Sequence, residues 1–278
     1  MKNSVKGTAG GNDSINIAPF TVQRNRCSFC YGAAFTAIFC GLSAFHTQSL
    51  QAQEKASLIG HWAFNEGEGV RVADSSGQGN HGAIVNEIQN VKWVEGRVGK
   101  ALAFAVNQGS RNENGCVVIT NMNKYDFGKG ITIEAWIRLD KNIVRNGTYE
   151  IVSNTESDRG KGFRFCISWN ALAFISGEGG TGKTWGASSN PSRTQIKPET
   201  WYHVAGTYDG SIFRVYLDGE EVGASEPGKE LTKGRNAVSI GAYVGGNAYG
   251  FEGLIDEIKI YNFSFAQLDI MKHAVLTP

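Results

Sequence analysis

The chain has 278 residues, with 27 Lys and Arg against 26 Asp and Glu and a formal net charge of +1. Nucleic-acid binding usually needs a basic patch or stripe, and this balance gives no sign of one. The 36 Gly, 5 Pro and 15 Phe fit many short strands joined by glycine turns, and long amphipathic helices are hard to find.

Residues 1–52 are predicted to be an export segment. A polar stretch ends in Arg24-Asn25-Arg26, the run from Cys27 to Phe45 is apolar and uncharged, and a polar stretch follows. This order is typical of a secretory signal, and we expect cleavage after Ala52. The alternative is an uncleaved membrane anchor, because the apolar run approaches spanning length. We therefore expect one domain over 53–278, secreted or in the cell envelope, with membrane contact only if the segment is uncleaved.

Short strands with period-2 alternation follow in chain order. The clearest is Ile131 to Leu139, in which apolar residues alternate with Thr132, Glu134, Trp136 and Arg138. Other expected strands are Leu58 to Asn65, Ala83 to Glu87, Ala101 to Phe104, Cys116 to Thr120, Tyr149 to Ser153, Phe163 to Trp169, Ala171 to Ser176, Ala237 to Ala242 and Leu254 to Tyr261. In Phe163 to Trp169 the alternation predicts that Trp169 shares a face with the phenylalanines.

Residues 201–222 predict a β-meander with two Asp-Gly turns. Asp209-Gly210 joins Trp201 to Tyr208 with Ser211 to Leu217, and Asp218-Gly219 leads into a third strand. Asp-Gly favours a hairpin because a type I′ turn needs φ > 0 at both central residues. Near the C-terminus, Ser264 to His273 is expected to form a helix, with capping-box spacing from Ser264 to Gln267. About a dozen strands and one terminal helix predict an all-β, two-sheet antiparallel sandwich.

Four blocks of this chain resemble, in order, the laminin-G-like (concanavalin A-like lectin/glucanase) jelly-roll domains, in particular the bacterial secreted group. They are HWAFNEGEG with DSSGQGNHG, GITIEAWIR, the meander WYHVAGTYDG…VYLDG, and FEGLIDEIKIYN. The resemblance covers nearly all of residues 53–278. It implies a jelly-roll β-sandwich whose ligands are glycans or surface proteins, held by rim loops.

The loop from Asp74 to Gly82 is the best metal candidate. A carboxylate, an amide and glycine carbonyls are oxygen donors of the kind Ca²⁺ takes. The resemblance implies a structural calcium held by Asp74, by groups between Gly77 and His81 such as Asn80, and by Asp256 from the last strand. The alternative is an Asx-type loop in which Asp74 accepts backbone N–H bonds and no metal binds. Cys116 and Cys166 are the two cysteines outside the export segment, and they are a candidate disulfide if their Cα atoms come close enough. The alternative is two buried thiols in separate strands.

Aromatic residues beside polar loops are the candidate ligand contacts: Trp185, Tyr149, Tyr243 and Tyr249, with Arg193. The alternative for each of them is packing in the core or at the rim. Gly177 to Thr184 matches the phosphate-binding pattern GxxxxGK[ST], but no helix is expected after it, so we read it as a hairpin loop and expect no nucleotide.

No catalytic motif appears. Glu220-Glu221 and Asp256-Glu257 are neighbours on strands, so their side chains should point to opposite faces and cannot easily form the facing carboxylates of glycoside hydrolysis. The sequence therefore predicts a secreted, non-catalytic module that binds glycan. A polysaccharide-acting hydrolase or lyase and a cell-envelope adhesion protein with protein partners remain the alternatives.

Overall fold

The computed structural model describes residues 52–86, 90–106, 114–140, 147–155, 157, 159–180, 182–243, 246 and 248–276. All of them belong to one compact unit that begins at Ser49. The predicted export segment lies outside the described residues except for Ala52. Among the helices of the described part, none has both the length and the apolar character needed to cross a membrane.

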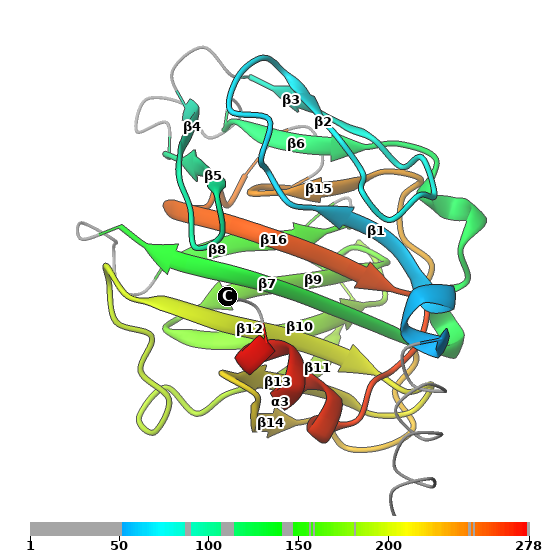
Figure 1. Ribbon diagram of the computed structural model, residues 1–278. Helices are drawn as coiled ribbons and strands as arrows, with labels where there is room; N and C mark the ends of the chain where they lie inside the picture. Colours follow the sequence, from blue (N-terminus) through cyan, green and yellow to red (C-terminus); the bar gives the residue numbers. More distant parts are fainter. Residues whose placement is uncertain are drawn as a thin grey trace, which may run out of the picture. The chain divides into compact units, whose positions relative to one another are not determined.

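Sheet A contains eight strands, and its longest members lie in the foreground of Figure 1. They are β1 (Leu58–Trp62), β4 (Val91–Glu95), β5 (Lys100–Phe104), β7 (Ile131–Leu139), β12 (Trp201–Tyr208), β13 (Phe213–Leu217), β14 (Glu220–Ala224) and β16 (Gly253–Tyr261). The order is β14-β13-β12-β7-β16-β5-β4, and β1 also pairs with β16.

Sheet B also contains eight strands. They are β2 (Arg71–Val72), β3 (Gly82–Val85), β6 (Cys116–Ile119), β8 (Thr148–Ser153), β9 (Phe163–Ser168), β10 (Ala171–Gly177), β11 (Thr184–Ser188) and β15 (Val238–Ile240). Their order is β11-β10-β9-β8-β15-β6-β3-β2. Every pairing in both sheets is antiparallel, so the predicted two-sheet antiparallel sandwich is confirmed.

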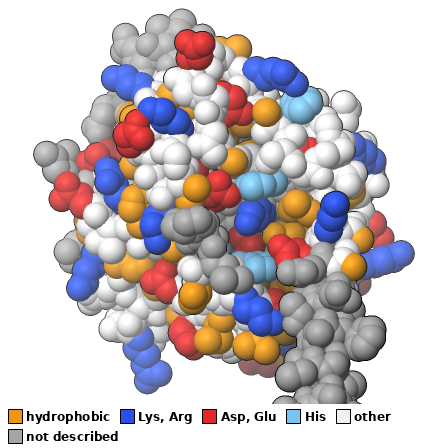
Figure 2. All heavy atoms as spheres, viewed as in Figure 1, with side chains coloured by type: hydrophobic (Ala, Val, Ile, Leu, Met, Phe, Trp, Pro, Cys, Tyr) orange, Lys and Arg blue, Asp and Glu red, His pale blue; other side chains and the backbone are white. Residues whose placement is uncertain are grey.

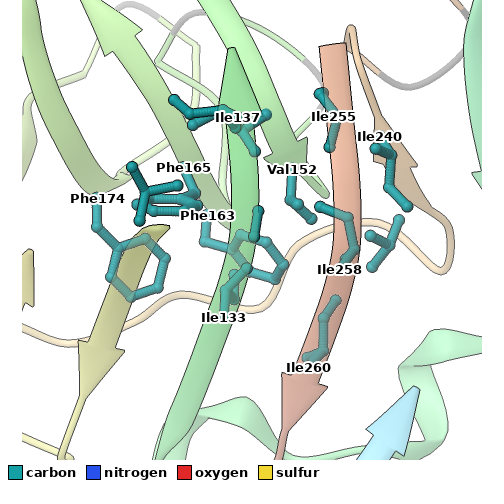
Figure 3. Close-up of a cluster of buried hydrophobic side chains, with 14 of the residues drawn as sticks. Ile133, Ile137, Val152, Phe163, Phe165, Phe174, Ile240, Ile255, Ile258 and Ile260 are labelled. Carbon is teal, nitrogen blue, oxygen red and sulfur yellow. The ribbon is translucent and has the colours of Figure 1, made fainter. Parts of the chain in front are cut away.

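The core lies between the sheets, where the alternation of β7 and β9 directs their apolar side chains. Figure 3 shows this layer, with Ile133, Ile137, Ile255, Ile258 and Ile260 from sheet A and Val152, Phe163, Phe165, Phe174 and Ile240 from sheet B. Phe174 makes edge-to-face contacts, with centroid distances of 6.0 Å to both Phe163 and Phe165 and 5.4 Å to Phe213. Each such pair adds about 0.5–1.5 kcal/mol beyond area burial. The core therefore fixes the sheets as a platform for the loops.

The two Asp-Gly turns of the meander differ. Asp218 and Gly219 have φ of 48° and 86°, as a type I′ turn requires, so this prediction is confirmed. At the first turn only Gly210 has a positive φ (94°). The carboxylate of Asp209 accepts the N–H groups of Ser211 and Ile212 at 3.0 and 2.8 Å, and β13 begins at Phe213 instead of Ser211.

The segment that matches the phosphate-binding pattern connects β10 to β11 of a hairpin. The Glu178 N–H donates to the Lys183 carbonyl (3.1 Å), and the Gly182 N–H donates to the Gly179 carbonyl (3.0 Å). Because the strand β11 follows the segment, it is not the strand-to-helix turn of a phosphate-binding loop.

The C-terminal helix α3 (Gln267–Leu276) begins three residues later than predicted. The Thr132 hydroxyl holds the preceding segment, because it donates to the Phe263 carbonyl (2.7 Å) and accepts the Phe265 N–H (3.0 Å). The helix buries Ile270 against the outer face of sheet A and leaves Leu268 62 % exposed. Two short 3₁₀ helices, η1 (Met122–Lys124) and η2 (Phe127–Lys129), precede β7.

The predicted disulfide between Cys116 and Cys166 is wrong. Both residues are buried thiols, Cys116 on β6 and Cys166 on β9. Two strands, β15 and β8, lie between these strands in sheet B. Three inter-strand spacings amount to about 14 Å, whereas a disulfide needs Cα atoms within about 7 Å.

Candidate functional site

The loops at the end of β7 carry the strongest candidate site. β7 runs from right to left in Figure 1 and ends at Leu139. We call this end the Trp169 rim and define it by Tyr149, the turn Trp169-Asn170 and residues 190–198. The antiparallel pairing of β9 with β10 places their connecting turn here, and the chain reaches the 190–198 loop directly after β11.

The alternation predicted Trp169 on the buried face of the strand, and this prediction is wrong. β9 ends at Ser168, and Trp169 and Asn170 occupy the turn with φ of 52° and 64°. Trp169 is 66 % exposed, and its backbone N–H donates to the Gly147 carbonyl (3.0 Å). A left-handed backbone costs a non-glycine residue roughly 1–2 kcal/mol. The two-residue hairpin between Ser168 and Ala171 requires this backbone, so the exposure of the large indole ring is what makes Trp169 a functional candidate.

A cavity of about 220 Å³ opens beside this turn. Its apolar wall includes Tyr149 and Ile167, and its polar wall includes Asn170, Ser192 and Gln195. Lys197 also lines it. An apolar wall with a few convergent polar groups is the usual composition of a small-molecule site.

The structure separates the five predicted ligand residues. Tyr149 lines the Trp169-rim cavity, and Arg193 is exposed on the 190–198 loop next to Ser192. Trp185 packs against the core, and its indole N–H donates to the Glu230 carbonyl (2.7 Å), so the packing alternative describes it better.

The other two, Tyr243 and Tyr249, meet at a buried ion pair that the sequence analysis missed. Their ring centroids are 5.0 Å apart, and the Arg164 guanidinium carbon lies 4.9 Å from the first and 5.2 Å from the second. Arg164 Nε donates to Glu150 Oε1 at 2.7 Å, and Arg164 and Glu150 are 8 % and 0 % exposed.

Burial alone would lower the pKa of Arg164, but the Glu150 carboxylate outweighs it and raises this pKa. Because Glu150 compensates the guanidinium charge, the cluster is a weaker ligand candidate than the Trp169 rim. In the sequence, the alternation of the charged Arg164 with Phe163 and Phe165 was the one indication of this ion pair. The sequence did not reveal that Glu150 is its partner.

The Asp74 loop adopts the Asx-type structure weighed as the alternative to a metal site. Asp74 Oδ1 accepts the N–H groups of His61 (3.0 Å) and Ser76 (2.9 Å), and Oδ2 accepts the N–H of Asn80 (2.8 Å). Burial alone would raise the pKa of Asp74, but these hydrogen bonds together lower it below its usual value. The loop is thereby tied to β1.

Asp256 is used in the same way. Its Oδ2 accepts the N–H groups of Arg97 (2.8 Å) and Val98 (2.9 Å), and its Oδ1 accepts that of Glu257 (2.8 Å). Burial raises the pKa of Asp256 to about 6, although these N–H groups oppose the shift.

The hydrogen bonds of Asp74 and Asp256 favour the Asx-type alternative over a calcium ligand set. Every oxygen of Asp74 and Asp256 already accepts at least one backbone N–H, and the two carboxylates bind different segments. Within the described ranges, no three or more His, Cys, Asp and Glu side chains gather where they could hold a metal. The predicted calcium site at Asp74, Gly77, Asn80 and Asp256 stays a prediction.

The adjacent carboxylates Asp256 and Glu257 do not lie on a regularly alternating strand. The register between β16 and β7 shifts between Asp256 and Lys259, and Glu257 has φ of 50°. His61 Nε2 lies 2.7 Å from Glu257 Oε2. Figure 2 looks onto this side of sheet A, where acidic, basic and histidine side chains lie close together near the middle. Asp256 is 0 % exposed and Glu257 9 %, so neither carboxylate is open to a substrate.

The chain belongs to the concanavalin A-like lectin/glucanase superfamily, because the Laminin_G_3 family model of that superfamily matches residues 111–271. This confirms the resemblance to laminin-G-like jelly rolls. A comparison with curated protein sequences finds no match.

Solved structures share the fold. One is domain 4 of an extracellular GH43 arabinanase from Geobacillus stearothermophilus, solved in complex with arabinotriose. It aligns with a TM-score of 0.53 and 19 % identity, over 78 % of this chain and 98 % of that domain. The binding domain of botulinum neurotoxin DC, in complex with rat synaptotagmin II, aligns with a TM-score of 0.58 and 16 % identity over 79 % of this chain and 51 % of that one.

A third structure is of botulinum neurotoxin type C, whose cell entry depends on interaction with two ganglioside molecules. It aligns with a TM-score of 0.60 and 14 % identity over 81 % of this chain and 52 % of that one. The chain thus spans about half the length of the neurotoxin chains that it matches.

Proposed function

We propose that this domain is an exported, non-catalytic module that binds carbohydrate at the Trp169 rim. The observation that carries the proposal is Trp169, which is 66 % exposed in a left-handed turn beside the cavity. An indole ring offers a flat apolar face that can stack on a sugar ring. Asn170, Ser192 and Gln195 place amide and hydroxyl groups at the cavity, where they can bond sugar hydroxyls.

Two further observations support this reading. The arabinanase domain with the same fold was solved with arabinotriose, an oligosaccharide. Hydrolysis of a glycosidic bond needs two accessible carboxyl groups about 5–10 Å apart. Asp256 and Glu257, the adjacent pair on β16, are buried and engaged by backbone N–H groups and by His61. The predicted export segment gives the domain access to extracellular glycans, and a protein ligand is the competing alternative.

The test is a glycan array probed with the full chain, followed by calorimetric titration of the best-bound neutral oligosaccharide. Replacing a central aromatic contact commonly costs 2 kcal/mol or more, so Trp169→Ala should weaken binding roughly 30-fold. Leu268→Ala is the matched control, because it removes an apolar side chain that is 62 % exposed on α3. Unchanged affinity of Trp169→Ala, or no array binding by the full chain, would contradict the proposal.

A further inference from the structure

A second cavity lies at the opposite end of β7 from the Trp169 rim. It has a volume of about 210 Å³ and lies between residues 122–128 and residues 231–235, which we call the Tyr125 rim. β7 begins three residues after residues 122–128, at Ile131, and its ninth and last residue is Leu139. The two rims are therefore separated by about 30 Å of extended strand.

The floor of this cavity is apolar and its wall is aromatic. Met122, Phe127 and Leu231 line it and are 1 %, 7 % and 8 % exposed. The half-buried Tyr125 ring lies 6.3 Å from the Phe127 ring, and Asn80 Nδ2 donates to the Tyr125 hydroxyl at 2.8 Å. The aromatic wall is thereby fixed in position before any ligand arrives, which lowers the entropic cost of binding.

The edge of the cavity is basic. Lys124, Lys233 and Arg235 are exposed lining residues that come from two different loops. Asp126 is the acidic side chain among the described lining residues. It is partly compensated, because its Oδ1 accepts the Gly128 N–H (3.1 Å) and its Oδ2 lies 3.8 Å from Lys129 Nζ. Among the described lining residues, three are therefore basic and one is acidic.

The loop that supplies two of these cations is held firmly. The backbone N–H of Arg235 donates to the Asn154 carbonyl at 2.8 Å. The Thr232 hydroxyl donates to the Gly177 carbonyl at 2.8 Å and accepts the Gly162 N–H at 2.9 Å. Residues 231–235 therefore present Lys233 and Arg235 from a backbone anchored to sheet B.

We propose that the Tyr125 rim is a second binding site, specific for an acidic saccharide. The apolar floor beside Tyr125 accepts a sugar ring, while Lys233 and Arg235 pair with its carboxylate or sulfate group. Lys124, whose Nζ lies 5.1 Å from the centroid of the Tyr125 ring, adds a third positive charge. Charge-assisted hydrogen bonds of this kind are roughly twice as strong as neutral ones. The site shares no residue with the Trp169 rim, so it does not depend on the function proposed there.

The test is calorimetric titration of the full chain with trigalacturonate, with its neutral methyl ester, and with a sulfated heparin hexasaccharide. We expect the carboxylated or the sulfated probe to bind at least about tenfold more tightly than the ester, because the ester has no charge to pair with the cations. Which of the two acidic probes binds tighter identifies the anionic group. Affinity for the acidic probe should fall as salt rises from 50 to 300 mM.

Variants separate this site from general electrostatics. Lys233→Ala/Arg235→Ala should lose at least about tenfold in affinity for the acidic probe. Lys92→Ala/Arg71→Ala removes the same charge from other exposed positions, with Lys92 beside Leu139 at the opposite end of β7, and should keep the affinity. Trp169→Ala should also keep it, which makes failure at one rim distinguishable from failure at the other. Any of four results would overturn the proposal. Both double variants could lose the same affinity, the ester could bind as tightly as the acidic probe, a poly-glutamate peptide could bind more tightly than the acidic probes, or neither acidic probe could bind.

Discussion

Raising the pH should weaken the contact between α3 and sheet A, because this contact depends on a charged histidine. His273 Nδ1 lies 2.9 and 3.0 Å from the two oxygens of Glu134, and its Nε2 lies 3.6 Å from Glu54 Oε1. The side chains of His273 and Glu134 are 13 % and 2 % exposed. The contact therefore joins α3, β7 and the helical residues 52–57 in a largely water-free setting.

The sign and the size of the effect follow from the pKa. Burial alone would lower the pKa of His273, but the hydrogen bonds to Glu134 and Glu54 raise it from 6.5 to about 9. The difference between 6.5 and about 9 corresponds to about 3 kcal/mol, because each tenfold change in proton affinity is worth about 1.36 kcal/mol. Because the folded state holds the proton more tightly, this stability is fully present below pH 6.5 and is lost as pH rises to about 9. Asp256, whose pKa burial raises to about 6, titrates below this window.

The assay is urea unfolding of the wild-type chain and of His273→Gln at pH 6.5 and 9.5. The wild type should lose about 3 kcal/mol more than the variant over this interval, which corresponds to roughly 6–12 °C in melting temperature for a domain of this size. Three other titratable residues lie near this contact: Lys259, Tyr261 and His203. The variant keeps all three, so their titration cancels when the losses of the two proteins are subtracted. Parallel losses in the two proteins would refute the assignment of the effect to His273.

Two further predictions concern buried carboxylates. Arg164→Met should lower the free energy of unfolding by about 3–5 kcal/mol in urea, because it leaves the fully buried Glu150 without its ion-pair partner, whereas Glu150→Leu/Arg164→Met should recover most of this loss. A double variant as unstable as the single one would contradict that reasoning. EDTA followed by excess CaCl₂ should leave the melting temperature unchanged. Asp74→Ala should lower the melting temperature, because the Asp74 carboxylate accepts backbone N–H groups that would lose their partner. A drop with EDTA that CaCl₂ reverses would instead support the calcium prediction.

The sheets could be predicted from the sequence wherever one strand face is apolar. The bounds of β7 and β12 match the predicted Ile131 to Leu139 and Trp201 to Tyr208. Strict alternation over nine residues gives β7 one consistent register, and the Asp209-Gly210 turn marks the end of β12. The pattern failed where a strand ends. A hairpin around Asn170 could be expected, because Asn tolerates a left-handed backbone. Alternation nevertheless runs on from Ile167 to Trp169, and nothing in the side chain of Trp169 indicates that it also belongs to the turn with positive φ.

The candidate sites required knowledge of strand order. Cys116 and Cys166 appeared as a possible pair until two intervening strands separated them. Conversely, Glu150 and Arg164 appeared unrelated until β8 and β9 became neighbours in sheet B. The Tyr125 rim combines residues about 110 positions apart in the chain, and neither loop has a motif of its own. Charge and aromatic content were visible in the sequence, but their convergence was not.

The distance between the two rims constrains any ligand that uses both. Nine residues of β7 span about 30 Å, which a trisaccharide cannot bridge, so short probes report on each rim separately. A long polysaccharide with neutral and acidic stretches could occupy both, and the second contact would then form at a high effective concentration. Such a polymer should bind more tightly than either short probe, and loss of either Trp169 or the Lys233 and Arg235 pair should reduce its affinity to that of the remaining rim. The arrangement of the loops at opposite ends of β7 therefore favours an extended glycan over a compact one.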